Sequence, residues 1–188
     1  MITCTFDIVG SSPISFGRPV QSIKKTGEKH DDFEHRTWRE RVHVDGKDIA
    51  FIPPMALKNC LTDVAQYLSE TIPGKGKATF TKKFKAGVMV IDPMDLGVKL
   101  ADIEGERIFV PSDGKRGGGS RVWKTFPVIR NWTVEATAYI ADPAIKPAKM
   151  LEYLTHAGKF IGLGRFRPIN NGFYGRFTIE NFEAIEED

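Results

Sequence analysis

Alternation of apolar and polar residues with a period of two is the most regular pattern in the chain. It is clearest over residues 3–9, where Cys4, Phe6 and Ile8 fall on one side. Successive side chains of a strand point to opposite faces of a sheet, so this period predicts strands. The segments predicted as strands or hairpins are residues 3–9, 39–52, 77–85, 87–91, 126–140 and 173–185.

Two other segments carry apolar residues three and four positions apart, which is typical of an amphipathic helix. The first begins at Pro53-Pro54 and ends before Pro73-Gly74, and proline is well tolerated in the first turn of a helix. The second covers residues 147–161. The residues expected to face a sheet are Met55, Leu57, Leu61, Val64, Leu68, Leu151, Leu154 and Ile161.

The order of these segments predicts an α+β protein. Strand, hairpin, helix, strands, helix and strand match a ferredoxin-like or RRM-like antiparallel sheet with two helices. Residues 20–40 are polar and residues 92–124 are irregular and glycine-rich, so both are interpreted as long loop insertions. A chain of 188 residues fits one domain, residues 1–188.

The composition of the chain bears on where the protein is located and on which partners it can bind. The net charge of +3 permits a nucleic-acid partner without requiring one. No apolar run approaches 18 residues and the first ten residues lack a signal-peptide pattern, so we expect a cytoplasmic protein that does not contact a membrane. Cys4 and Cys60 have no zinc-binding spacing, and are expected to be small core residues.

Two glycine-containing segments lack the pattern of a nucleotide site. Gly162-Leu163-Gly164 follows a predicted helix, and Arg167 stands where a dinucleotide fingerprint needs its third glycine. Gly76-Lys77-Ala78 lacks the Ser or Thr and the upstream glycine of a P-loop. The sequence therefore predicts neither a dinucleotide nor a nucleoside triphosphate, and no cofactor.

The segment 162–177 combines glycines, arginines and aromatic residues. Glycine lets the backbone approach a ligand closely, arginine binds phosphate, and aromatic rings stack on bases. The alternative is a glycine-capped helix that leads into a tight turn, with the aromatic residues in the core. The candidate RNA-binding residues here are Gly162, Gly164, Arg165, Arg167 and Arg176.

Basic residues also gather in two other segments that contain few carboxylates. Such segments bind a phosphate backbone electrostatically, although a charge run is also typical of an ordinary solvated surface. The candidates for RNA contact are Lys75, Lys77, Lys82, Lys83, Arg116 and Arg121.

Four histidines, His30, His35, His43 and His156, could supply acid–base or metal chemistry. His30 and His35 are singled out because they lie beside Asp31 and Asp32 in the first insertion. This cluster suggests a metal or nuclease site, but it has no recognised ligand spacing, and solvated loop histidines are common. We therefore predict no catalytic residue and no metal site.

Three segments together resemble the RAMP superfamily of CRISPR proteins. Residues 51–58 resemble its strand, proline and helix start; residues 12–17 resemble its turn with Phe-Gly; and residues 162–175 resemble its C-terminal glycine-rich loop. The resemblance implies a backbone subunit that binds guide RNA along its sheet and loops and stacks head to tail. By the same resemblance, Lys58 would contact phosphate, and the two insertions would be thumb-like projections.

The sequence thus favours a non-catalytic binder of single-stranded RNA, with single-stranded DNA as a second ligand. Its expected protein partners are further copies of itself or CRISPR-type subunits. The short chain suggests a stand-alone relative borne by a phage or prophage. Two alternatives remain open: a metal-independent endoribonuclease that uses His30 or His35, and a phage decoy that blocks CRISPR subunits.

Overall fold

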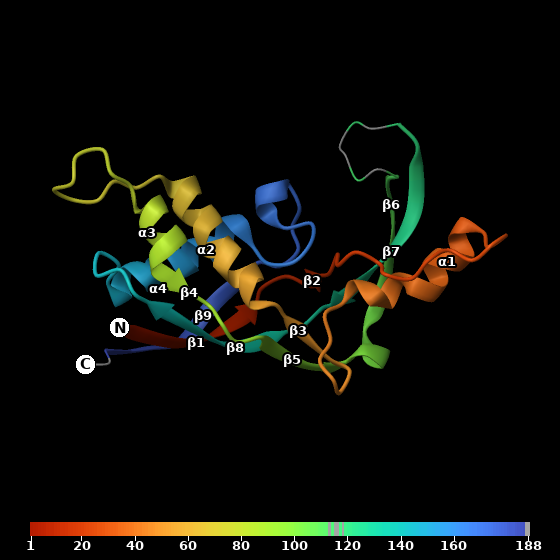
Figure 1. Cartoon of the computed structure of the whole chain (residues 1–188), viewed down its shortest axis with the longest axis horizontal. Coiled ribbons are helices and arrows are strands. Elements are labelled where there is room, and N and C mark those ends of the chain that lie inside the picture. Colours follow the sequence, from red (N-terminus) through yellow and green to blue (C-terminus); the bar gives the residue numbers. More distant parts are fainter. Residues whose placement is uncertain (113, 115–116, 118, 187–188) are drawn as a thin grey trace.

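The main layer of the protein is an antiparallel sheet of four strands in the order β4-β8-β1-β9 (Figure 1). The computed structural model describes residues 1–112, 114, 117 and 119–186. The four strands are β1 (Ile2–Gly10), β4 (Val88–Met89), β8 (Thr133–Ile140) and β9 (Phe177–Glu186). Cys4, Phe6 and Ile8 are buried on one face of β1, which confirms the strand predicted from their alternation.

Three helices cover the face of this sheet that carries the buried side chains (Figure 1). They are α2 (Pro54–Leu68), α3 (Phe80–Gly87) and α4 (Pro147–His156), and α4 continues into a π-helical turn over Ala157–Ile161. The helices predicted from the apolar spacing are α2 and α4, so both are confirmed. The chain passes through β1, α2, β4, β8, α4 and β9 in that order.

The core between the helices and the sheet contains most of the predicted residues. Leu57, Leu61, Val64, Leu154 and Ile161 are buried, whereas Leu68 and Leu151 are half-buried. Cys4 and Cys60 are both fully buried, as expected.

Met55 is the exception, because 58% of its surface is exposed. It precedes Leu57 by two positions, and two residues of an α-helix lie about 200° apart around the axis. The prediction that Met55 faces the sheet is therefore wrong.

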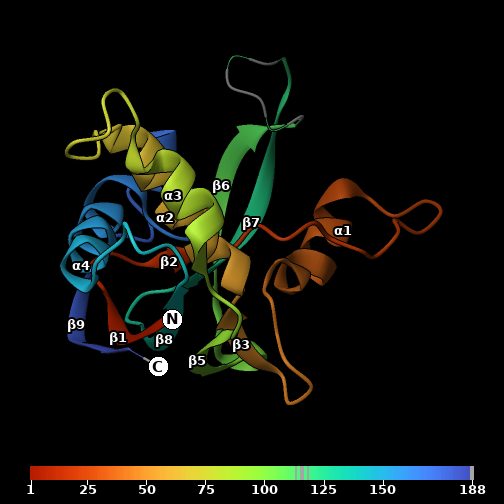
Figure 2. The ribbon, with the colours of Figure 1, turned by 60° about the vertical axis from the view of Figure 1, so that its left-hand side comes forward.

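A second sheet leads away from the first. It contains β2 (Ile14–Ser15), β7 (Arg121–Ile129) and β6 (Glu104–Pro111), in the order β2-β7-β6. β6 pairs with β7 along the whole length of β6, and the two strands project from the body as a long hairpin, which we call the arm (Figures 1 and 2). The prediction that residues 92–124 are irregular is wrong for these strands.

The alternation in the arm is hidden because both of its faces carry apolar residues. Val110 is buried on one face, whereas Phe109 and Trp123, which pair across the strands, are 44% and 47% exposed on the other. A strand that is apolar on both sides has no period-two signal in its sequence.

The first insertion contains α1 (His30–Thr37) and a 3-10 turn over Trp38–Arg41, which pack against the base of the arm. Glu34 makes this contact. Its Oε2 accepts a hydrogen bond from Arg41 Nη2 at 3.0 Å, and its Oε1 accepts one from Thr125 N on β7 at 2.7 Å. The prediction of a loop over residues 20–40 is wrong in this part, because the helix buries mainly Glu34 and Thr37 and shows no apolar stripe.

The predicted hairpin over residues 39–52 is only partly right. β3 (Ile49–Ile52) pairs along its length with β5 (Met94–Lys99). It meets the preceding segment at a bridge between Val44 and Ala50, beside backbone hydrogen bonds from Asp45 N to Ile49 O and from Phe51 N to His43 O. A local turn therefore forms, but the main partner strand comes from a distant part of the chain.

The predicted strand over residues 77–85 is wrong, because α3 occupies most of this segment. Phe80 and Phe84 lie one helical turn apart and both rings contact Tyr153 of α4, with 4.3 Å between the ring centres of Phe84 and Tyr153. Burial of these two aromatic residues explains the helix.

Candidate nucleic-acid interface

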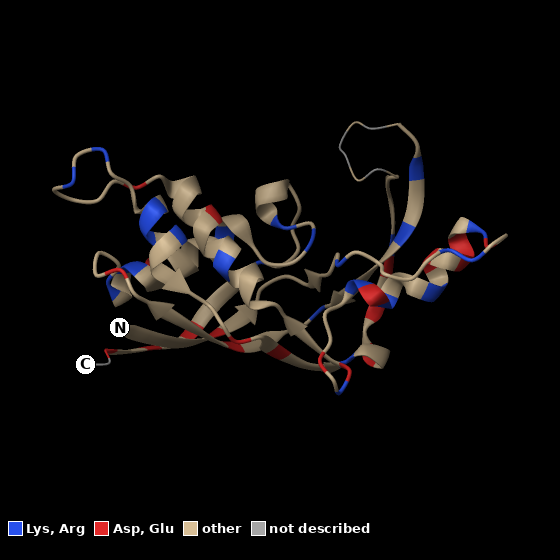
Figure 3. Cartoon of the chain, viewed as in Figure 1, with Lys and Arg blue, Asp and Glu red and all other residues tan. Residues whose placement is uncertain are grey.

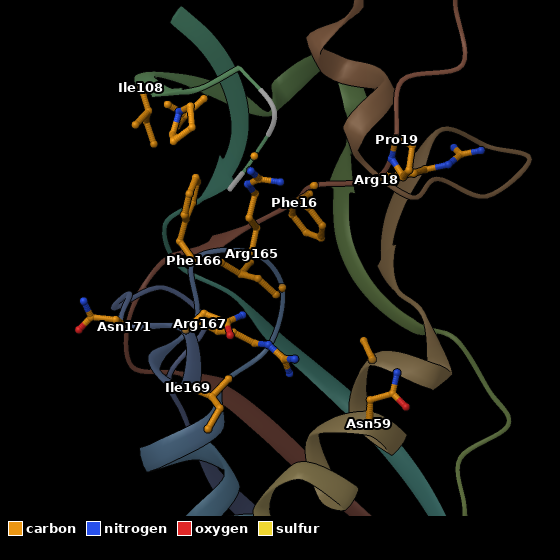
Figure 4. Close-up of a pocket in the computed structure, with 18 of the residues that line it drawn as sticks. Phe16, Arg18, Pro19, Asn59, Ile108, Arg165, Phe166, Arg167, Ile169 and Asn171 are labelled. Carbon is orange, nitrogen blue, oxygen red and sulfur yellow. The ribbon is translucent and has the colours of Figure 1, made fainter. Parts of the chain in front are cut away.

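A groove with a volume of about 1440 Å³ separates the arm from the body of the protein (Figure 4). One wall is residues 108–111 of β6 together with Arg121. The opposite wall is residues 164–167 and 169–171. Ile14, residues 16–19, His43 and the segment from Ile52 into the first turns of α2 also line the groove. Segments that are far apart in the sequence thus meet around one open cavity.

The glycine-rich loop adopts the conformation that its residues suggest. Gly164 has φ +75°, and Gly175 has φ +71°, values that favour glycine over all other residues. The backbone N–H of Arg165 donates to Ser15 O at 2.7 Å, and that of Gly175 donates to Pro13 O at 2.7 Å. The loop is therefore fastened to the segment around β2.

Arg165 is held among aromatic rings. Its guanidinium carbon lies 4.4 Å from the ring centre of Phe126 and 4.8 Å from that of Phe166. In the view of Figure 4 it stands between Phe16 and Phe166. Burial, with a smaller effect of the Arg41 charge, lowers the pKa of Arg165. Its Nε is buried and has no hydrogen-bond partner among the described residues.

Other cations line the same groove. Arg167 pairs with Asp63 of α2 at 3.2 Å between Nη2 and Oδ2, and Arg121 stands on the arm with its guanidinium carbon 5.6 Å from the ring centre of Phe109. Arg18 adds a third contribution from the segment after β2. The groove therefore combines positive charge with exposed aromatic and glycine surfaces, which suits a single-stranded nucleic acid.

The remaining predicted cations lie elsewhere. Lys75 and Lys77 are exposed in the loop between α2 and α3, and Lys82 and Lys83 lie on α3, where Lys83 Nζ is 2.9 Å from Asp142 Oδ2 (Figure 3). Arg176 donates to the carbonyl of Lys159. Gly162 shapes the start of the loop but does not line the groove, and Arg116 lies outside the described residues.

The Lys58 side chain binds the C-terminal end of α3. Its Nζ donates to the backbone carbonyls of Phe84 at 2.5 Å and Lys85 at 3.0 Å, both in the last turn of α3. Burial lowers the pKa of Lys58. These bonds satisfy carbonyls that the helix end leaves open, and they place a cation at the negative end of the helix dipole.

We expect Lys58→Met to destabilise the protein by about 1–2 kcal/mol, because it removes two charged hydrogen bonds from a helix end. Urea unfolding measures this change, and Lys82→Met, on the exposed side of α3, is the matched control with an expected effect within about 0.5 kcal/mol. A Lys58→Met protein with unchanged stability and weakened RNA binding would instead support the phosphate contact that the family resemblance implies.

The open face of the main sheet is acidic. Asp7 on β1 lies opposite Glu135 on β8 and Glu180 on β9, so three carboxylates cross the sheet in one row (Figure 3). Carboxylates repel phosphate, and this disfavours RNA on that face. The expected binding along the sheet and loops is therefore better placed in the groove than on the sheet.

The histidines lie in separate parts of the structure. His30 and His35 are exposed on α1, whereas His43 lines the groove beside Arg18. Burial, and then the charge of Arg18, lowers the pKa of His43. The sequence named His43 only as one of four histidines, and it did not single out Arg18, which belongs to no motif.

Comparison with protein-family models and with curated proteins finds no match. Among solved structures, the chain is similar to one chain of the cryo-EM structure of the type III-B Cmr-β bound to cognate target RNA, with a TM-score of 0.58 and 12% sequence identity. The similarity covers 98% of this chain and 61% of that one, so this chain corresponds to less than two thirds of its neighbour. At this identity the likeness shows a shared fold and nothing more specific.

Neither a membrane-spanning helix nor a metal-binding cluster is found among the described residues. Within them, no helix has the length and apolarity needed to cross a bilayer. The same part of the chain contains no group of three or more His, Cys, Asp or Glu side chains arranged to hold a metal ion.

Proposed function

We propose that this protein is a non-catalytic, single-stranded RNA-binding protein that takes the strand into the groove between the arm and the glycine-rich loop. The observation that carries the proposal is the convergence of Arg18, Arg121, Arg165 and Arg167 on one open cavity. Cations bind the phosphates and aromatic rings stack on unpaired bases, as in other single-strand binders.

The fold supports a closer assignment. The order β-α-β-β-α-β around a sheet with β1 and β8 in its centre supports our assignment of a ferredoxin-like domain. We assign the chain to the RAMP superfamily, as a cytoplasmic relative of CRISPR backbone subunits with the arm in place of a thumb.

The proposed partners follow from the same argument. The structural neighbour belongs to an assembly bound to target RNA, which supports RNA as the ligand and similar subunits, or further copies of this chain, as protein partners. A stand-alone relative from a phage or prophage, acting alone or as a decoy for CRISPR subunits, would retain the same groove.

Fluorescence anisotropy with labelled single-stranded RNA tests the proposal directly. We expect binding that weakens steeply between about 50 and 200 mM salt, because each phosphate contact releases counterions from the strand. Labelled DNA of the same sequence shows whether the 2′-hydroxyl matters. Absence of RNA binding at about 50 mM salt, where phosphate contacts are strong, contradicts the proposal.

We further expect that the purified protein does not cut RNA. His30→Ala/His35→Ala should leave binding unchanged, because both side chains are exposed on α1 outside the groove. Gel electrophoresis of labelled RNA after long incubation, with and without EDTA, measures cleavage. Metal-independent cleavage that is lost in this double variant, or in His43→Ala, would favour the endoribonuclease instead.

A further inference from the structure

The base of the arm contains two arginines with unused hydrogen-bond donors. Arg165 comes from the glycine-rich loop and Arg41 from the turn after α1, and their guanidinium carbons lie 4.4 and 5.4 Å from the ring centre of Phe126. One aromatic side chain of β7 thus holds two cations from distant parts of the sequence.

Both arginines are incompletely paired. Arg41 is only 8% exposed; its Nη2 binds Glu34, but its Nη1 is buried and has no hydrogen-bond partner in the described part of the chain. Arg165 Nε is likewise buried without a partner, and the ion pairs among the described residues do not include Arg165. Buried donors of this kind are costly unless a ligand satisfies them.

The local charge favours an anion. Glu34 pairs with Arg41 and accepts a bond from Thr125 N, and Glu106, opposite Phe126 on β6, is hydrogen-bonded to Tyr174. Neither carboxylate forms an ion pair with Arg165. Ser15, whose carbonyl accepts the Arg165 N–H, adds a buried hydroxyl that also has no partner among the described residues. Arginine forks bind the tetrahedral oxygens of phosphate in particular.

We propose that Arg41 and Arg165 together bind one phosphate group in a subsite at the base of the arm. The subsite opens to the groove through Arg165, and Arg18, which lines the groove, donates its backbone N–H to Arg41 O at 3.1 Å. A phosphate bound there joins the arm, the α1 segment and the glycine-rich loop. The proposed function supplies the source of the phosphate, and the inference rests on it for that point only. The source is either an internal phosphodiester or a terminal phosphate of the RNA strand.

Inorganic phosphate tests the subsite without RNA. We expect the melting temperature to rise saturably, by roughly 3–5 °C, with phosphate relative to chloride at equal ionic strength. Arg165→Gln and Arg41→Lys should abolish the rise. Arg41→Lys keeps a cation for Glu34, so that the fold is retained, but removes the fork. Lys47→Gln, in an exposed turn, removes one charge elsewhere and should keep the full rise.

A rise that is absent in the native protein, or equal in all four proteins, overturns the subsite. RNA binding is measured on the same proteins with oligonucleotides that carry a 5′-phosphate, a 3′-phosphate or only hydroxyl ends. A preference of about tenfold or more for one phosphorylated end, lost in Arg41→Lys, identifies a terminal phosphate, whereas equal affinities that all fall in Arg41→Lys identify an internal one. Phosphate binding without RNA binding would contradict the proposed function alone, and RNA binding without phosphate binding would contradict the subsite alone.

Discussion

Gly164→Val is expected to destabilise the protein by about 3 kcal/mol or more and to remove most of its RNA binding. Gly164 has φ +75°, and a Cβ atom there would collide with the backbone carbonyl of Ser15 and touch the Ile14 side chain. The collision displaces the carbonyl that accepts the Arg165 N–H, so the loop loses its attachment and Arg165 its position.

Gly74→Val separates the cost of backbone strain at a positive φ from the cost of the collision with Ser15. Gly74 has φ +73°, almost the same as Gly164, but a Cβ atom there meets nothing within 4 Å. It should therefore cost only the backbone strain, about 1–2 kcal/mol, and leave RNA affinity unchanged. Urea unfolding and anisotropy on both variants measure the difference. Equal losses of stability would mean that the contact between the loop and β2 does not hold the groove together.

The sequence predicted the parts of the fold whose pattern is local. β1, α2 and α4 each bury one side against the core, so the period of their apolar residues survives in the chain. The sequence did not predict the arm or α1, because one is apolar on both faces and the other is held by a buried carboxylate. Neither arrangement leaves a periodic signal.

The part of the candidate site that the sequence predicted is the glycine-rich loop, because its glycines indicate the backbone conformation. Gly164, Arg165 and Arg167 belong to a glycine-rich loop, and they line the groove together with the predicted Arg121. Lys58 was expected at a phosphate because it follows a recognisable proline and helix start, yet its ammonium group caps α3 from a different part of the chain. Tertiary contacts of this kind cannot be derived from spacing along the sequence.

The residues that the sequence did not single out share a dependence on tertiary structure. Arg41, Phe126 and His43 acquire their positions only when the α1 segment, the arm and the glycine-rich loop meet. Each lies in a segment whose sequence carries no motif, so the sequence alone gives no reason to place it in the groove or at the base of the arm. The groove is a property of the tertiary structure, and the glycine-rich loop is the one wall that a sequence motif reveals.

Arg165→Gln/Arg167→Gln is expected to weaken RNA binding about 100-fold at low salt, because each lost phosphate contact is worth roughly 1.4 kcal/mol or more. The double variant should also reduce the slope of log affinity against log salt by about 1.4, since each contact with a single strand contributes about 0.7. Anisotropy titrations at several salt concentrations give both quantities, and the losses should be similar for RNAs of different sequence, because phosphates carry no base identity.

Lys75→Gln/Lys77→Gln is the matched control for this prediction. It removes the same charge from an exposed loop between α2 and α3, outside the residues that line the groove. If the groove binds the strand, this variant should lose no more than about threefold in affinity, through the weaker overall field. Equal losses in the two double variants would show that RNA responds to net charge alone. A larger loss in the lysine variant would place the RNA-binding surface at the loop before α3, and it would contradict the proposal that the groove binds the strand.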